Sequence, residues 1–314
     1  MKRFLPILLA LAAAVSPSAA SAAKLRVIAT IPGLADMTER IGGDHVSVES
    51  LAHGSEDIHQ VVMRPSFVPK LNRADAVVYL GLTVEHSFLP GLLDAAVNPK
   101  MRTDPVRECV GPGCIDCSEN VPILEKPSSL SRAEGELHPY GNPHYNVGPQ
   151  NGPQIARNIA AGLERVDPAH KDDYEKNLKS YLDELDAKIA QWKKLVAPLK
   201  GMKAISYHKD VAYLGAFTGL DFVDTVELKP GVPPTPTHIN QLVEEMKRDN
   251  VKLIVREQHF SPQIPEWLAQ QTGAKIAVIG VMAKSMPNTE TWEKLMDRNL
   301  NDIVDAAKAA KGGS

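Results

Sequence analysis

"DPAHKDDYEKNLKSYLDELDAKIAQWKKLVAPLK", residues 167–200, is the stretch that decides the fold. Its apolar residues recur at helical spacing for about thirty residues, which is longer than an average globular helix. We expect Asp167 to cap this helix and Pro168 to begin it. A helix of this length suits a rigid connector between two lobes. Its apolar stripe predicts core packing and consists of Leu178, Tyr181, Leu182, Leu185, Ile189 and Trp192.

Strand-like and helix-like segments alternate on both sides of this connector. Before it, apolar strands are predicted at 25–31, 46–52 and 75–82, each followed by a helical pattern. After it, the same rhythm returns, with strands at 203–208, 220–228, 251–257 and 274–280. Such alternation predicts an α/β fold of two Rossmann-like (β/α) lobes with parallel sheets. We expect an N-terminal lobe at 24–166, the connecting helix at 167–199 and a C-terminal lobe at 200–314.

Residues 98–137 break this rhythm. They are rich in proline, glycine and charge, and we predict a long loop or insertion. They also hold all three cysteines, Cys109, Cys114 and Cys117. In an exported protein a disulfide is the default. We therefore expect one disulfide across a surface loop and one cysteine left over, while the spacing does not say which pair forms.

Residues 1–23 have the pattern of a secretory signal peptide. Lys2 and Arg3 precede an apolar run from 4 to 15, which is too short to span a membrane, and small residues follow. We expect a periplasmic protein without a lipid anchor, because no cysteine lies near the expected cleavage point. Loss of Lys2 and Arg3 takes the net charge from −3 to −5. With no basic stripe in the sequence, this charge argues against a nucleic-acid partner.

Candidate metal ligands stand where the predicted strands end. Ligands of open parallel sheets bind beyond the carboxyl ends of the strands. His59 follows the strand at 46–52, His208 ends the strand at 203–208, and Glu257 ends the strand at 251–257. His144 lies in a turn-rich loop. Three imidazoles and one oxygen would suit zinc, although histidines this far apart carry no metal signature by themselves. We assign ordinary structural roles to His45, His86, His170 and His238.

Five segments in order carry a family resemblance: "HGSEDIHQVVMRPSFVPKLNRADAVVYLG" (53–81), "NPHYNVGP" (142–149), "SYHKDVAYLGAFTGL" (206–220), "ELKPGVPPTPTHINQLVEEMK" (227–247) and "VREQHFSPQIPEWLAQQTGAKIAVI" (255–279). Together they resemble the zinc and manganese substrate-binding proteins of ABC importers, in their zinc-binding branch. The resemblance implies two (β/α) lobes with a metal ion buried between them. Carried over by position, the ligands are His59, His144 and His208, and His53 is not a ligand. A histidine at the third position implies zinc, whereas a carboxylate there implies manganese or iron.

The sequence departs from the family pattern at the fourth ligand. The family often places an aspartate after its last strand, but "VIGVMAKSMPN" (278–288) has no acid. Glu257 is our first candidate for this position and water is the alternative. The weaker candidates are Glu227, His138 and His259. An open position is also what a catalytic zinc needs, so a zinc hydrolase is a competing class, although the chain has no H-E-x-x-H motif.

These observations predict a monomeric, non-enzymatic protein that captures Zn2+ as its cargo. Mn2+ and Fe2+ are the alternatives within the same family. The expected partner is the membrane permease of an ABC importer. An exported zinc metallochaperone or adhesin, docking through residues 109–137, is the alternative from another class. Because imidazoles must be deprotonated to bind metal, affinity should fall below about pH 6.5. We also expect the long helix to limit hinge opening.

Overall fold

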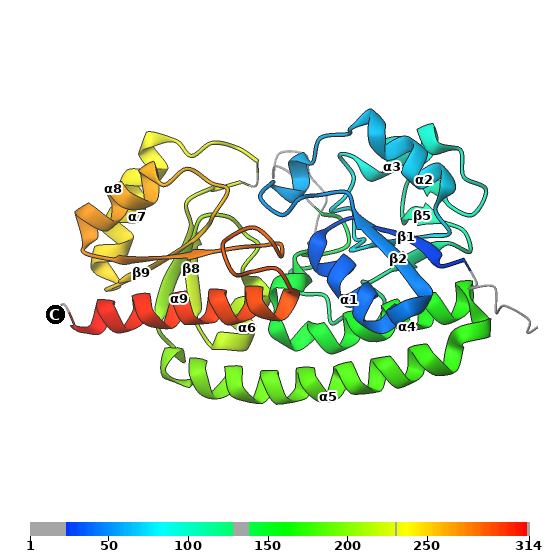
Figure 1. Ribbon diagram of the computed structural model, residues 1–314. Coiled ribbons are helices and arrows are strands. Elements are labelled where there is room, and N and C mark those ends of the chain that lie inside the picture. The colour runs from blue at the N-terminus through cyan, green and yellow to red at the C-terminus, as the bar shows by residue number, and fades with distance from the viewer. Residues whose placement is uncertain (1–22, 128–137, 230, 313–314) are drawn as a thin grey trace, which may run out of the picture.

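The long helix underlies both lobes of the molecule. The computed structural model describes residues 23–127, 138–229 and 231–312, and in it the helix is α5 (Lys171–Val196, 26 residues). It lies beneath both lobes (Figure 1). Tyr181, Leu185 and Trp192 are buried in the core, as the apolar stripe predicted. Short 3-10 turns extend the helix at both ends, η7 (Pro168–His170) and η8 (Ala197–Leu199).

The start of this helix differs from our expectation. The Asp167 side chain caps no backbone N–H group. Its Oδ2 instead accepts hydrogen bonds from Tyr174 Oη at 2.7 Å and from His170 Nδ1 at 2.7 Å. His170 also stacks on His45, whose Nε2 lies 2.9 Å from Asp173 Oδ2. Side-chain contacts therefore hold the first turn, and both histidines have the structural roles we expected.

The N-terminal lobe is built on a four-stranded parallel sheet in the order β2-β1-β3-β6. Short strand-to-helix connections place helices against this sheet, as parallel pairing requires. Its strands are β1 (Leu25–Ala29), β2 (Val46–Ser50), β3 (Ala76–Tyr79) and β6 (Cys114–Asp116). Its helices are α1 (Pro32–Gly42), α2 (Val68–Arg73), α3 (Leu89–Ala96) and α4 (Gly152–Val166).

The segment 98–137 is not the single loop that we predicted. Strands β4 (Arg102–Asp104) and β5 (Glu108–Val110) form an antiparallel hairpin, and β6 completes the main sheet beside β3. A disulfide joins Cys109 on β5 to Cys114 on β6, and Cys117 is free and buried. One disulfide with one cysteine left over is thereby confirmed. Residues 128–137 lie outside the described part of the chain.

The C-terminal lobe repeats the architecture. Its four-stranded parallel sheet has the order β10-β9-β7-β8. Its strands are β7 (Lys203–Ser206), β8 (Asp221–Thr225), β9 (Leu253–Glu257) and β10 (Lys275–Ile279). Its helices are α6 (Ala212–Thr218), α7 (Pro236–Arg248), α8 (Gln263–Thr272) and α9 (Trp292–Gly312). Two parallel (β/α) lobes joined by one long helix confirm the predicted fold class.

One apolar core runs through both lobes. It continues from β1 and β3 to Leu253 and Val255 of β9, and a second cluster fills the other face of the C-terminal sheet. Helix α9 packs on β10, α1 and α5. Trp292 at its start donates from Nε1 to Asn146 O at 2.8 Å, and Asn146 Nδ2 donates to Val281 O at 2.9 Å. Because the core is shared, the lobes hold each other in place.

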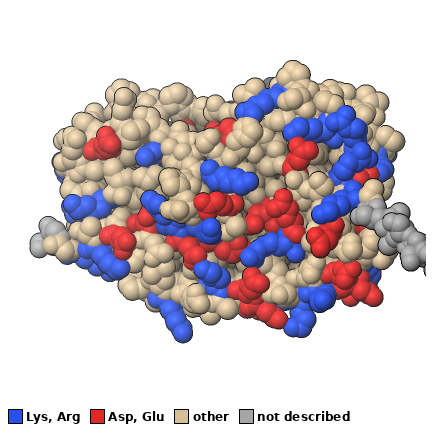
Figure 2. Space-filling model, viewed as in Figure 1, with Lys and Arg blue, Asp and Glu red and all other residues tan. Residues whose placement is uncertain are grey.

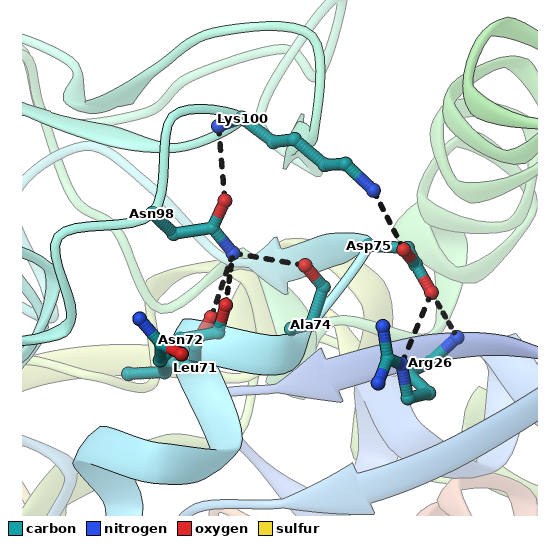
Figure 3. Close-up of polar contacts among 7 residues, drawn as sticks. All are labelled: Arg26, Leu71, Asn72, Ala74, Asp75, Asn98 and Lys100. Atoms are coloured by element: carbon teal, nitrogen blue, oxygen red, sulfur yellow. Dashed lines mark hydrogen bonds and ion pairs between the residues drawn. The ribbon is translucent and has the colours of Figure 1, made fainter.

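Asn98 anchors the N-terminal lobe where α2 ends (Figure 3). Its Nδ2 lies within hydrogen-bond distance of the carbonyls of Leu71 and Ala74, at 2.8 and 2.9 Å. Next to it, Lys100 Nζ pairs with Asp75 Oδ1 at 2.6 Å, and Arg26 N donates to Asp75 Oδ2. The last carbonyls of a helix need such partners. This network therefore fixes the entry into β3 and the edge of the sheet.

Charges of both signs are interspersed along α5 and α9 on the face shown in Figure 2. Among the described residues, no helix is both long enough and apolar enough to cross a membrane. The predicted signal peptide lies outside the described residues except for Ala23.

Candidate metal centre

Three histidines from three separate segments meet between the lobes. His59 lies in η2 (Ile58–Gln60), a 3-10 turn that comes after β2 in the chain. Asp57 directly precedes this turn. The Asp57 carboxylate accepts from the His59 backbone N–H at 2.9 Å and so fixes this turn. His144 directly precedes the 3-10 turn η5 (Tyr145–Val147), and His208 follows β7. The strand ends and loops singled out in the sequence therefore converge.

The distances among these rings fit a shared metal ion. The Nε2 atoms of His59 and His144 lie 2.9 Å apart, and one ligand atom from each of the three histidines lies within 4.8 Å of the other two. Among the described residues this is the one group of three or more metal-binding side chains. The cavity that they line has a volume of about 30 Å³, which is roughly the share of one water molecule in the liquid. It can hold a single small ion.

Hydrogen bonds orient two of the three rings. His208 Nδ1 lies 2.8 Å from Glu227 Oε2, and His144 Nδ1 lies 3.0 Å from Asn142 Oδ1. Each bond occupies Nδ1, so Nε2 keeps its lone pair for a metal. His59 Nδ1 has no hydrogen-bond partner among the described residues.

Comparison with known proteins identifies the family to which this chain belongs. Residues 27–306 match the family model of the ZnuA proteins, described as the zinc-uptake complex component A, periplasmic. The chain belongs to the ZnuA family. It is accordingly a metal-binding, substrate-binding protein of an ABC transporter. The family consists of solute-binding proteins and not of enzymes, so the zinc-hydrolase hypothesis is dropped.

Curated relatives of this ZnuA-family chain are named for different metals. A metal ABC transporter substrate-binding lipoprotein, ScbA of Streptococcus cristatus, is 27% identical, covering 92% of this chain and 91% of the relative. The manganese lipoprotein PsaA of Streptococcus pneumoniae is 26% identical, covering 91% and 90%. The zinc-binding lipoprotein AdcA of the same species is 23% identical, and the match covers 89% of this chain but 55% of that protein.

Solved structures agree with this assignment. A crystal structure of ZnuA superposes with a TM-score of 0.71 at 26% identity, covering 93% of this chain and all of that one. A manganese-bound periplasmic metal-binding protein from Candidatus Liberibacter asiaticus gives a TM-score of 0.72 at 21% identity, covering 90% and 99%. At 21% identity, the similarity to the second structure supports the fold and nothing more.

Burial sets the protonation of the histidines in this ZnuA-family site. Burial lowers the pKa of His59 to about 4 and the pKa of His144 well below its usual range. Burial acts on His208 in the same direction, but the Glu227 carboxylate and then the charge of Asp210 raise its pKa overall. His59 and His144 are therefore neutral at neutral pH, and His208 is the ring whose proton competes with a metal ion.

Glu257, our first candidate for the fourth ligand, does not line the cavity. It ends β9, is fully buried, and neither carboxylate oxygen has a donor among the described residues. Its pKa is raised well above the usual range, first by burial and then by the charge of Asp210 beside it. A proton shared between these two acids would supply the missing donor. Glu257 therefore lies next to Asp210 and outside the cavity lining.

The weaker candidates for the fourth ligand differ in where they lie relative to the cavity. Glu227 lines the cavity but its carboxylate is bound to His208. His259 lines the cavity, and its Nδ1 has no partner among the described residues. His138 stacks on His59 with ring centroids 5.2 Å apart, and burial lowers its pKa to about 3. His53 is exposed and bonded to Arg64 outside the cavity.

Asp210 is an acid of the cavity lining that our sequence analysis did not consider. It lies two residues after His208, in the loop between β7 and α6, and it lines the same cavity. The available signal was an acid two residues after a histidine that follows a strand.

Proposed function

We propose that this protein captures Zn2+ in the periplasm through His59, His144 and His208 and delivers it to the permease of an ABC importer. The observation that supports this most strongly is the convergence of three imidazoles on one ion-sized cavity between the lobes. Imidazole nitrogen is a better ligand for zinc than for manganese, which prefers oxygen. Two rings already held by Glu227 and Asn142 reduce the ordering needed when the ion binds.

Manganese is the alternative cargo, because several relatives are named for it. Manganese prefers carboxylate, carbonyl and water oxygens as ligands, whereas three of the ligands proposed here are imidazoles. The relatives are also named lipoproteins. In this chain the three cysteines lie at 109, 114 and 117, and the absence of a lipid anchor stays a prediction, as does the monomeric state.

Metal content and competition titration of the purified protein test the proposal. We expect one zinc ion per chain, bound more tightly than manganese. The single variants His59→Ala, His144→Ala and His208→Ala should each weaken zinc binding by at least about 100-fold, since each removes a ligand. His53→Ala is the matched control, because His53 is an exposed histidine of the same loop. Tighter binding of manganese, or zinc binding that survives all three substitutions, would contradict the proposal.

A further inference from the structure

We propose that Asp210 supplies the fourth ligand to the metal ion that His59, His144 and His208 hold. This inference rests on the proposed metal-binding function and names a residue that completes the same site. It replaces Glu257, the acid that the sequence favoured.

The backbone after β7 presents Asp210 to the cavity. His208 and Asp210 are both buried, while Lys209 between them is exposed, in the bend and turn that follow β7. Asp210 is 2% exposed and lines the cavity together with the three histidines. Its Oδ1 has no hydrogen-bond partner among the described residues. A buried carboxylate oxygen without a donor is costly, and a bound cation would compensate it.

The other oxygen ligands around the cavity are already engaged. Asp57 accepts from the backbone N–H of His59 and from Gln60 Nε2, at 2.9 and 3.1 Å. Glu227 Oε2 is bound to His208 Nδ1. Recruiting either acid as a ligand would release a histidine from the contact that positions it. Recruiting Asp210 breaks no such contact, because the three histidines are held by Asp57, Asn142 and Glu227.

Charge favours an acid at this position. Three neutral imidazoles bring no negative charge into direct contact with a divalent ion, and one carboxylate ligand would offset half of the ion's charge. In this structure the Asp210 oxygens are not within the 4.8 Å group that the histidines form. The carboxylate must therefore turn toward the ion on binding.

Zinc competition titration and the visible spectrum of the cobalt(II)-loaded protein test the inference. We expect Asp210→Asn to weaken zinc binding by about 100-fold or more, as loss of a ligand should exceed the 10–100-fold effect of outer residues. The cobalt bands, which report the ligand set directly, should shift. Glu257→Gln, at a neighbouring acid that does not line the cavity, should leave the cobalt bands in place. Asp221→Asn, an exposed aspartate at the start of β8, is the control for a change of charge alone.

Three results would overturn the inference. Wild-type zinc affinity and unchanged cobalt bands in Asp210→Asn would leave the metal-binding function intact but remove Asp210 from the site. A larger loss in His259→Gln than in Asp210→Asn would assign the fourth position to His259. Absence of zinc binding by the unmodified protein would overturn both the inference and the proposed function. Thermal unfolding of each metal-free variant separates a lost ligand from a lost fold.

Discussion

Glu227 shows how a residue can act on the proposed metal site through a histidine ligand. Its carboxylate holds His208 Nδ1 at 2.8 Å in a buried setting, which fixes both the ring and its tautomer. Glu227→Gln keeps the size of the side chain but removes the charge. We expect zinc affinity to fall by roughly 10–100-fold. Competition titration measures the change, and Glu244→Gln on the surface of α7 is the control. Unchanged affinity would mean that the ring is held by packing alone.

The same pair sets the pH dependence of binding. Burial lowers the pKa of His208, but Glu227 and Asp210 raise it overall, whereas His59 has a pKa of about 4. As pH falls through the raised pKa of His208, a proton occupies the ring that zinc needs, so affinity falls first through this residue. In Glu227→Gln the fall should begin at lower pH. Calorimetric titration in two buffers of different ionisation enthalpy should show fewer protons released by the variant near neutral pH.

Glu108 makes a separate prediction about stability. It is buried at the end of the β4–β5 hairpin, Thr83 N donates to its Oε2 at 2.9 Å, and Oε1 has no partner among the described residues. Burial and then the charge of Glu85 raise its pKa to about 9. Between pH 4.5 and 9 the unfolded chain has released this proton while the folded chain keeps it. The wild-type protein therefore loses stability as pH rises through that window.

Glu108→Gln removes this loss. Its free energy of unfolding should match that of the wild type near pH 5 and exceed it by about 2–4 kcal/mol at pH 8. Urea unfolding at the two pH values measures the difference. Glu119→Gln, an exposed acid of the same segment, should give a difference that does not vary with pH. A Glu108→Gln variant less stable than the wild type at pH 8 would show that Glu108 is ionised in the folded protein.

At the scale of elements, the disulfide between β5 and β6 joins the hairpin to the edge of the main sheet. It links residues five positions apart, Cys109 and Cys114. Closing so short a loop is worth about 2 kcal/mol of unfolding free energy. We expect the double variant Cys109→Ala/Cys114→Ala to be less stable by about that amount. Urea unfolding with and without reductant tests this: the wild type should lose the same stability in reductant, and the double variant should not respond.

This region also shows which features of the fold can be predicted from sequence patterns and which cannot. The long strands and α5 were predictable because apolar period and length agree over many residues. Strand β6 has three residues between turns, and its place beside β3 depends on pairing with a distant segment. His59 and His208 were predictable because they follow strand ends. Glu257 ends a strand too, but it does not line the cavity, and sequence periodicity does not indicate which of two neighbouring acids faces a cavity.

At the scale of the whole molecule, the shared core decides how the protein responds to its cargo. Helices α5 and α9 pack against elements of both lobes, and Trp192 Nε1 joins them by donating to Asp297 Oδ1 at 2.7 Å. Opening the lobes widely would expose this core to water. We therefore expect loading to order the loops that carry His59 and Asp210 and to leave the lobes in place. The radius of gyration from solution scattering should change by less than about 1 Å between the metal-free and zinc-loaded forms.

Loading should nevertheless stabilise the protein strongly, because only the folded chain brings the three histidines together. With free zinc at about 1,000 times its dissociation constant, binding adds about 4 kcal/mol to the free energy of unfolding. For a chain of this size that corresponds to a rise in Tm on the order of 10 °C. Calorimetry should show this rise in the wild type and in His53→Ala, but not in His208→Ala. A rise in Tm accompanied by a decrease of several ångströms in the radius of gyration would instead show that the lobes close over the ion.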